Sequence, residues 1–155
     1  MSNQLLFSVA GARGIVGKTI DADVVTRLTL AYCATLPKGP VVVGRDTRPS
    51  GEAFMYSVMG AVMASGRDVI DIGIATTPTT ELVTERTDAV GGIVVTASHN
   101  PVQWNALKFA SSEGMFLDAE QAPRMREFLD DTKIVRATRQ SLTSGFTPTS
   151  ALPLQ

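Results

Sequence analysis

The chain has 155 residues, 44% of them hydrophobic, and a formal net charge of -1 at pH 7. This length and apolar content suffice for one well-buried domain, whereas a near-neutral charge gives no overall field for nucleic acid or an anionic membrane, so we expect neither partner. The one cysteine, Cys33, excludes an intramolecular disulfide, no apolar run reaches membrane-spanning length, and a cytoplasmic location is therefore expected.

The first predicted elements are a strand and a helix joined by a glycine-rich stretch. The apolar run LLFSVA (5–10) predicts a strand, and DADVVTRLTLAYCATL (21–36) predicts a helix with Asp21 as its N-cap. Between them lies GARGIVGKT (11–19), which we interpret as a glycine-rich turn.

The same stretch also fits a relaxed nucleotide-binding P-loop pattern. Gly17, Lys18 and Thr19 occupy the places that would cradle and neutralise phosphates. In a P-loop protein the helix begins at the Gly-Lys-Thr itself, whereas the helix signal here begins at Asp21, whose carboxylate would repel a phosphate. We therefore favour the turn over nucleotide binding.

The middle of the chain alternates strands with helices. The short apolar runs at 40–46, 67–73 and 91–97 predict strands, and the segments at 50–66 and 77–88 have helical spacing. Continuous apolar strands separated by helix-length segments indicate a parallel sheet covered on both faces. We predict an α/β fold, a three-layer α/β/α domain with a mostly parallel mixed sheet.

Terminal signals refine this pattern. Ser50 is the expected N-cap of the helix at 50–66, and Gly66 sits where a left-handed residue ends a helix. Further along, ALKFAS and MFL flank the turn residues SEG (112–114) and predict an antiparallel hairpin at the edge of the sheet.

The C-terminal part is predicted to hold one more helix and then a tail. A helix is expected over 118–131, where Asp118 and Gln121 have the spacing of a capping box. From Thr138 the composition shifts to Ser, Thr, Gly and Pro, so we predict a domain over 1–137 and a linker or loose tail over 138–155.

The strongest functional signal follows the strand at 91–97. Ligands bind outside the carboxyl ends of strands in an open α/β sheet, which is where the loop with Ser98, His99 and Asn100 would lie. Ser98 offers a hydroxyl that can carry a group, His99 and Lys108 offer cationic or proton-handling side chains, and Asn100 can order the loop. A simple turn and an outward, solvated Lys108 are the alternatives from residue types alone.

Two arginines lie at the end of the strand predicted at 40–46, Arg45 within it and Arg48 just after it. They either hold the Ser98 loop from the carboxyl edge of the sheet or pair with Asp46 and Glu52 at the surface. We favour the ion pairs.

Several stretches together resemble one enzyme family. TASHNP (96–101) followed by NALK (105–108) is similar to the phosphoserine loop of the α-D-phosphohexomutases, the superfamily of phosphoglucomutase, phosphomannomutase and phosphoglucosamine mutase. VVVGRDTRPSGE (41–52) and GARGIVG (11–17) also resemble segments of that family. The resemblance runs from about Phe7 to about Leu129 and corresponds to the first of the family's four domains.

The resemblance implies an intramolecular phosphotransferase of carbohydrate metabolism. Such enzymes move a phosphoryl group between the 1- and 6-positions of a hexose phosphate through a bisphosphate intermediate, which also serves as activator. By motif match, the phosphoserine is Ser98, and His99 and Lys108 are the other catalytic residues. The phosphate environment would include Arg13, Arg45, Asn100 and Asn105.

The resemblance also implies partners beyond this chain. A Mg²⁺ ion would take one ligand from the phosphate of Ser98 and the others from an aspartate loop in the family's second domain. That loop and the sugar-selecting and phosphate-clamping loops of later domains have no match here, so we expect the chain alone to be inactive. A non-catalytic phosphate-binding or interaction module of the same fold is the alternative.

Two departures from the family pattern concern the site. Val16 stands where the family has an arginine, with Arg13 three residues earlier as a possible substitute. Ala106 stands where a glycine is usual, which matters only if that position needs a positive φ.

Overall fold

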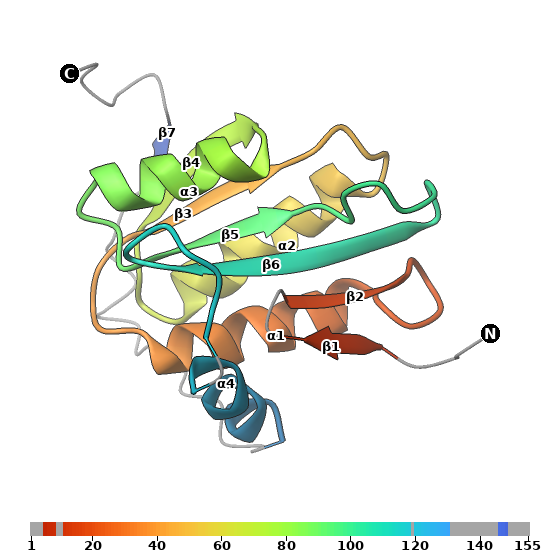
Figure 1. Cartoon of the computed structure of the whole chain (residues 1–155), viewed down its shortest axis with the longest axis horizontal. Coiled ribbons are helices and arrows are strands. Elements are labelled where there is room, and N and C mark those ends of the chain that lie inside the picture. Colours follow the sequence, from red (N-terminus) through yellow and green to blue (C-terminus); the bar gives the residue numbers. More distant parts are fainter. Residues whose placement is uncertain (1–4, 9–10, 119, 131–145, 149–155) are drawn as a thin grey trace.

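A seven-stranded mixed sheet, in the order β1-β2-β6-β5-β3-β4-β7, forms the centre of the molecule. The computed structural model describes residues 5–8, 11–118, 120–130 and 146–148 (Figure 1). Within this part, no helix is long and apolar enough to cross a membrane. The elements are β1 (Leu6–Ser8), β2 (Gly11–Ile15), α1 (Ala22–Thr35), β3 (Val41–Arg45), α2 (Gly51–Ala64), β4 (Val69–Ile74), α3 (Thr77–Arg86), β5 (Gly91–Val95), β6 (Trp104–Ser111), α4 (Gln121–Asp130) and β7 (Phe146–Pro148).

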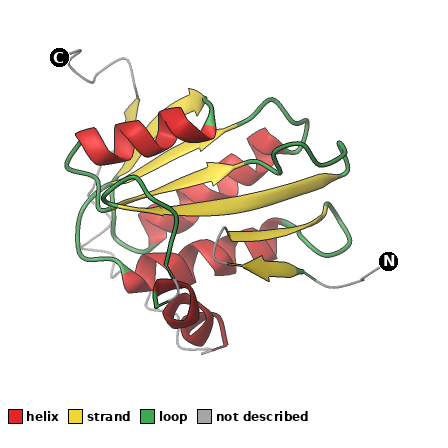
Figure 2. Ribbon diagram, viewed as in Figure 1, coloured by secondary structure: helices red, strands yellow, loops and turns green. Residues whose placement is uncertain are grey.

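The helices cover both faces of the sheet, which confirms the three-layer α/β/α prediction (Figure 2). Alternate residues of β3 point to opposite faces. Val41 and Val43 pack in the larger core with α1 and α2, whereas Val42 packs in a smaller cluster with Val83 of α3. The larger core also holds Phe109 of β6 and contacts of α1 with α4.

The sheet has a parallel and an antiparallel half. β5, β3 and β4 pair in parallel, as the alternating strands and helices predicted, and β7 pairs in parallel with β4. β6 pairs antiparallel with β5 on one side and with β2 on the other, and β1 pairs antiparallel with β2. The prediction that β6 forms an edge hairpin is therefore wrong, and of the residues at 115–117 only Phe116 forms a bridge, with Ala110.

The prediction of a turn over the whole glycine-rich stretch is wrong, because Gly11–Ile15 forms strand β2. Its glycines serve close packing. A Cβ on Gly11 would collide with the carbonyl of Leu107, and one on Gly14 would collide with the Thr19 hydroxyl. The tight turn comes afterwards, where Gly17 has a φ of 73°.

Helix ends follow the predicted signals with one exception. Asp21 caps α1 by accepting from the Val24 amide, and Asp118 and Gln121 form a reciprocal capping box. Gly66 has a φ of 80°, as a left-handed residue after a helix requires. Ser50, however, makes no side-chain cap, because its hydroxyl accepts from Asn105 Nδ2 instead.

The segment expected to be a tail contains one short element. Phe146–Pro148 forms β7 and pairs with β4, with Val69 opposite Phe146. The rest of the predicted tail over 138–155 lies outside the described residues, so the domain boundary stays a prediction.

Packing around Gly91 generates a stability prediction. A Cβ on Gly91 would collide with the hydroxyl of buried Tyr32, which donates to the Ala110 carbonyl over 2.6 Å. We expect Gly91→Ala to lower the free energy of unfolding by about 2 kcal/mol, because overpacking displaces the ring. Exposed Gly60 in α2 has open space around it, so Gly60→Ala is the control and raises stability by roughly 0.5–1 kcal/mol.

Urea denaturation of both variants measures these changes. A Gly91→Ala protein as stable as the unaltered chain would contradict the packing described around Tyr32.

Candidate active site

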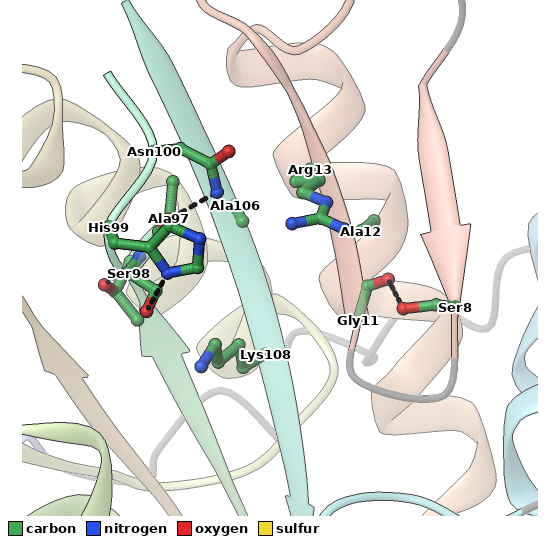
Figure 3. A pocket seen from close by; sticks show the side chains of 11 residues that line it. Ser8, Gly11, Ala12, Arg13, Ala97, Ser98, His99, Asn100, Ala106 and Lys108 are labelled. Carbon is green, nitrogen blue, oxygen red and sulfur yellow. Dashed lines mark hydrogen bonds between the residues drawn. The ribbon is translucent and has the colours of Figure 1, made fainter. Parts of the chain in front are cut away.

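The candidate site is a cavity at the carboxyl end of β5. Its volume is about 210 Å³, and its lining includes five residues singled out from the sequence, namely Arg13, Ser98, His99, Asn100 and Lys108. Figure 3 shows that β2, β6 and the loop after β5 supply these side chains. The placement agrees with the rule that ligands of open α/β sheets bind beyond the carboxyl ends of the strands.

Ser98 is exposed and has an unusual backbone conformation. Its φ is 56°, the one positive value for a non-glycine residue in the part of the chain that the structure describes. Its amide donates to Thr96 Oγ1 over 3.0 Å, and that hydroxyl donates to Asp46 Oδ2 over 2.6 Å. Such a conformation costs about 1–3 kcal/mol and persists only where surrounding contacts impose it. The loop is therefore held in a shape that presents the Ser98 hydroxyl.

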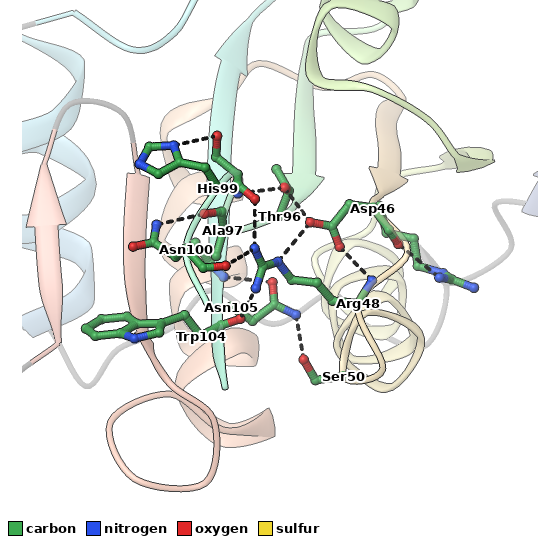
Figure 4. A network of polar contacts seen from close by, with 12 residues as sticks. Asp46, Arg48, Ser50, Thr96, Ala97, His99, Asn100, Trp104 and Asn105 are labelled. Carbon is green, nitrogen blue, oxygen red and sulfur yellow. Dashed lines mark hydrogen bonds and ion pairs between the residues drawn. The ribbon is translucent and has the colours of Figure 1, made fainter. Parts of the chain in front are cut away.

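Arg48 imposes much of that shape, because its guanidinium lies beneath the loop and binds it from one side (Figure 4). The side chain is only 10% exposed, and its Nε binds Asp46 Oδ2 at 3.0 Å. Its remaining donors bind four backbone carbonyls, those of Ser98 (2.7 Å), Asn100 (2.7 Å), Pro101 (2.9 Å) and Trp104 (2.9 Å). Of the ion pairs favoured from the sequence, Arg48–Asp46 is present, and so is the loop contact that was the alternative. Among the described residues, no ion pair joins Arg45 or Glu52 to another side chain.

Arg45 and Asn105 do not reach the cavity. Arg45 donates to the backbone carbonyl of Asp46 over 3.0 Å. Asn105 is fully buried, and its side chain joins β6 to the start of α2 through Ser50. The structure thus separates these two residues from the group around Ser98, and both act on the scaffold of the site.

The two proton-handling candidates lie on different walls. His99 is exposed, and its Nδ1 is 3.5 Å from Ser98 Oγ. Lys108 is half-buried, with its Nζ 5.2 Å from the ring centroid of Phe116, a cation–π contact. Burial raises the pKa of nearby Glu81, and the positive charge of Lys108 partly opposes this.

The cavity suits an anion. Its lining carries the cationic Arg13 and Lys108 together with His99, and it includes no carboxylate. The nearest acidic group of the loop network, Asp46, is bound to Arg48 and Thr96. Magnesium prefers oxygen ligands, mainly carboxylates, and no group of three or more His, Cys, Asp or Glu side chains that could hold a metal occurs among the described residues.

The turn after β2 leaves no place for a nucleotide phosphate. The amides of Gly17, Lys18 and Thr19 all donate to the backbone carbonyls of Ile15 or Ile20 within the turn. A P-loop needs those amides for the phosphates, and its helix would begin at the lysine, whereas α1 begins at Ala22. The geometry therefore rules against nucleotide binding here.

The fold and the site together define an α/β/α domain that has an exposed serine at a cationic cavity. The family described as phosphoglucomutase/phosphomannomutase, alpha/beta/alpha domain I, matches residues 4–134. The chain belongs to this family, which confirms the resemblance noted in the sequence.

Individual relatives agree with this assignment. The chain is 37% identical over 129 residues to a phosphoglucosamine mutase of Clostridioides difficile, and 36% identical over 137 residues to a phosphoglucomutase/phosphomannomutase of Thermococcus kodakarensis. The matches cover 81% and 85% of this chain but only 29% and 30% of those proteins. A solved phosphoglucomutase/phosphomannomutase family protein of Burkholderia thailandensis superposes with a TM-score of 0.78 at 26% identity, covering 92% of this chain and 32% of that one.

The Arg48 contacts generate a prediction about the loop. Lysine keeps the charge but lacks the planar fork that binds several carbonyls at once. We expect Arg48→Lys to speed amide hydrogen exchange at Ser98 and Asn100 by at least roughly tenfold, the equivalent of about 1.4 kcal/mol lost from loop protection.

The matched control is Arg86→Lys, at an exposed position in the last turn of α3. It is expected to leave loop exchange unchanged. Unaltered exchange in the Arg48→Lys protein would show that the loop holds its shape without the guanidinium.

Proposed function

We propose that this domain carries the phosphoryl-accepting serine of a phosphohexomutase, and that Ser98 is this residue. The observation that carries the proposal is the geometry at Ser98. Its backbone is held in a left-handed conformation, and its exposed side chain lines a cavity together with cations. The family assignment supports it, and relatives named phosphoglucosamine mutase and phosphoglucomutase/phosphomannomutase point to a hexose phosphate as substrate.

The proposed reaction consists of two phosphoryl transfers, which move two different phosphoryl groups. In the first transfer, the bond between phosphorus and Ser98 Oγ breaks while a sugar hydroxyl oxygen bonds to phosphorus. The proton of that hydroxyl passes to water, and Ser98 Oγ takes a proton from Lys108. The hexose bisphosphate then presents its other phosphate, which moves to Ser98 Oγ as that oxygen returns its proton to Lys108, and the sugar oxygen left behind takes a proton from water. Phosphoryl transfer depends mainly on positioning and on cations around the spreading charge, which is what this cavity offers.

Specific residue roles are part of the proposal. Lys108 stabilises charge on the transferring group and exchanges a proton with Ser98 Oγ during the two transfers. His99 lies beside the transferring group, since its Nδ1 is 3.5 Å from that oxygen. Asn100 orders the loop, because its Nδ2 donates to the Ala97 carbonyl over 2.7 Å.

A magnesium ion does not fit the described residues by themselves. When bound, such an ion would neutralise charge on the phosphate, but the cavity lining supplies no carboxylate to hold it. We infer that the phosphate of Ser98 is the ligand from this chain, and that turnover needs the family's remaining domains. We further propose a cytoplasmic location, with which the buried, unpaired Cys33 is compatible.

The test of the proposed function is a phosphate on Ser98. Chain isolated from its native cells should show an intact mass increased by one phosphate, and the increase should disappear in Ser98→Ala. Ser112→Ala, at an exposed turn position, is the control and should keep the phosphate. An unmodified native chain would favour the alternative, a non-catalytic phosphate-binding module.

The ligand count generates a second prediction. With phosphoserine at position 98, the chain alone should bind Mg²⁺ no more tightly than free phosphoserine does, because one phosphate without carboxylates makes a poor site for an ion that gives up water reluctantly. Titration calorimetry measures both affinities. Markedly tighter binding by the chain would mean that a carboxylate such as Asp46 or Asp71 reaches the phosphate.

A further inference from the structure

Arg13 is the cation of the cavity whose purpose the loop motifs do not explain. It is exposed on β2, whose backbone pairs with β1 and β6, and its side chain forms no hydrogen bond or ion pair among the described residues. Figure 3 shows its guanidinium extending from β2 toward the loop that carries Ser98 and Asn100.

The register of the sheet places Arg13 and Lys108 on one face. Arg13 lies opposite Ala106 in the antiparallel pair of β2 and β6, and Lys108 is two residues beyond Ala106 on the same strand. Side chains of directly opposed residues, and of residues two apart, point to the same face, and such diagonal neighbours are about 7–8 Å apart. All three side chains accordingly line the cavity.

Two cations so placed repel each other unless an anion lies between them. The cavity lining offers no carboxylate to fill that role. The small Ala106 side chain separates the two cations, so the face has room for a bound group. A phosphate matches the site, because a guanidinium can bind two of its oxygens at once while an ammonium binds as a point charge.

Position 16, at the start of the neighbouring turn, carries an apolar side chain. Val16 packs against the main hydrophobic core, and its amide donates to the Gln103 carbonyl over 2.9 Å. Arg13, on the preceding strand, is instead directed into the cavity.

We propose that Arg13 directly binds the phosphoryl group on Ser98, in place of a cation at position 16. This inference rests on the proposed function for the identity of the anion. It assigns the guanidinium to the phosphate oxygens on the side of the cavity formed by β2, opposite His99 on the loop.

A thermodynamic cycle tests the contact without requiring catalysis. Phosphoserine is installed at position 98 of the full chain during synthesis. Thermal unfolding midpoints are then measured, in the presence of a metal chelator, for serine and for phosphoserine at this position, each combined with Arg13 or with Arg13→Ala. We expect phosphorylation to raise the midpoint by about 2 °C more with Arg13 than with Arg13→Ala, as a charge-assisted pair in a chain of this size predicts.

Two further variants sharpen the result. Arg13→Lys should recover part of the coupling, because it keeps the charge and loses the fork. Lys18→Ala removes an exposed cation in the turn after β2 that does not line the cavity, and it should show no coupling to the phosphate. Equal coupling for Lys18 and Arg13 would overturn the inference by showing a general charge effect.

Two-dimensional ¹H–¹⁵N NMR of the arginine side chains gives an independent readout. On phosphorylation, the Arg13 Nε–H signal should shift downfield and exchange more slowly with water, while that of Arg48, already bound to Asp46, should stay in place. An unmoved Arg13 signal, or zero coupling in the cycle, overturns the inference.

The outcomes for the two proposals are separable. Native Ser98 without phosphate, together with coupling of installed phosphoserine to Arg13, refutes the proposed function and leaves a phosphate site. A natively phosphorylated Ser98 that is uncoupled from Arg13 leaves the proposed function standing and refutes this contact.

Discussion

The guanidinium of Arg48 is the constraint on which the site depends. Loop carbonyls normally face water, but here four of them converge on one side chain, which is itself fixed by Asp46. Each hydrogen bond to a charged group contributes about 1.5–3 kcal/mol, enough in sum to offset the left-handed backbone of Ser98. The carboxyl ends of β3 and β5 are thereby joined, and the serine hydroxyl is fixed relative to the sheet before any ligand arrives.

The reversal of strand direction beside β5 supplies the rest of the cavity. A purely parallel sheet would bring only loops to its carboxyl edge, whereas antiparallel β6 and β2 bring side chains along their length. Lys108 and Arg13 are therefore held by strand ladders, and Gly11 allows those two strands to approach closely. The ladders fix the backbone positions from which both cations reach the cavity, so little backbone ordering remains for anion binding.

The sequence predicted the alternating core well, because continuous apolar strands and helical spacing are dictated by burial in three layers. It failed at β2, where glycines that permit close packing look the same as glycines that permit a turn. That error also made β6 look like an edge strand. The sequence suggested the ion pair and the loop contact of Arg48 as alternatives, but only the folded chain shows one guanidinium binding both Asp46 and the loop. Likewise, Ser50 has the residue type of a cap, yet Asn105 binds its hydroxyl.

The distribution of charge explains how one domain can contribute to a larger active site. The cations around Ser98 can hold a phosphate but cannot hold a magnesium ion, since the cavity lining has no carboxylate. A carboxylate placed there would pair with Arg13 or Lys108 and cancel the field that attracts the phosphate. Keeping acidic ligands on a separate surface preserves that field until the surfaces meet. On the proposed function, this domain supplies the anion site, and metal binding depends on carboxylates from outside the cavity lining.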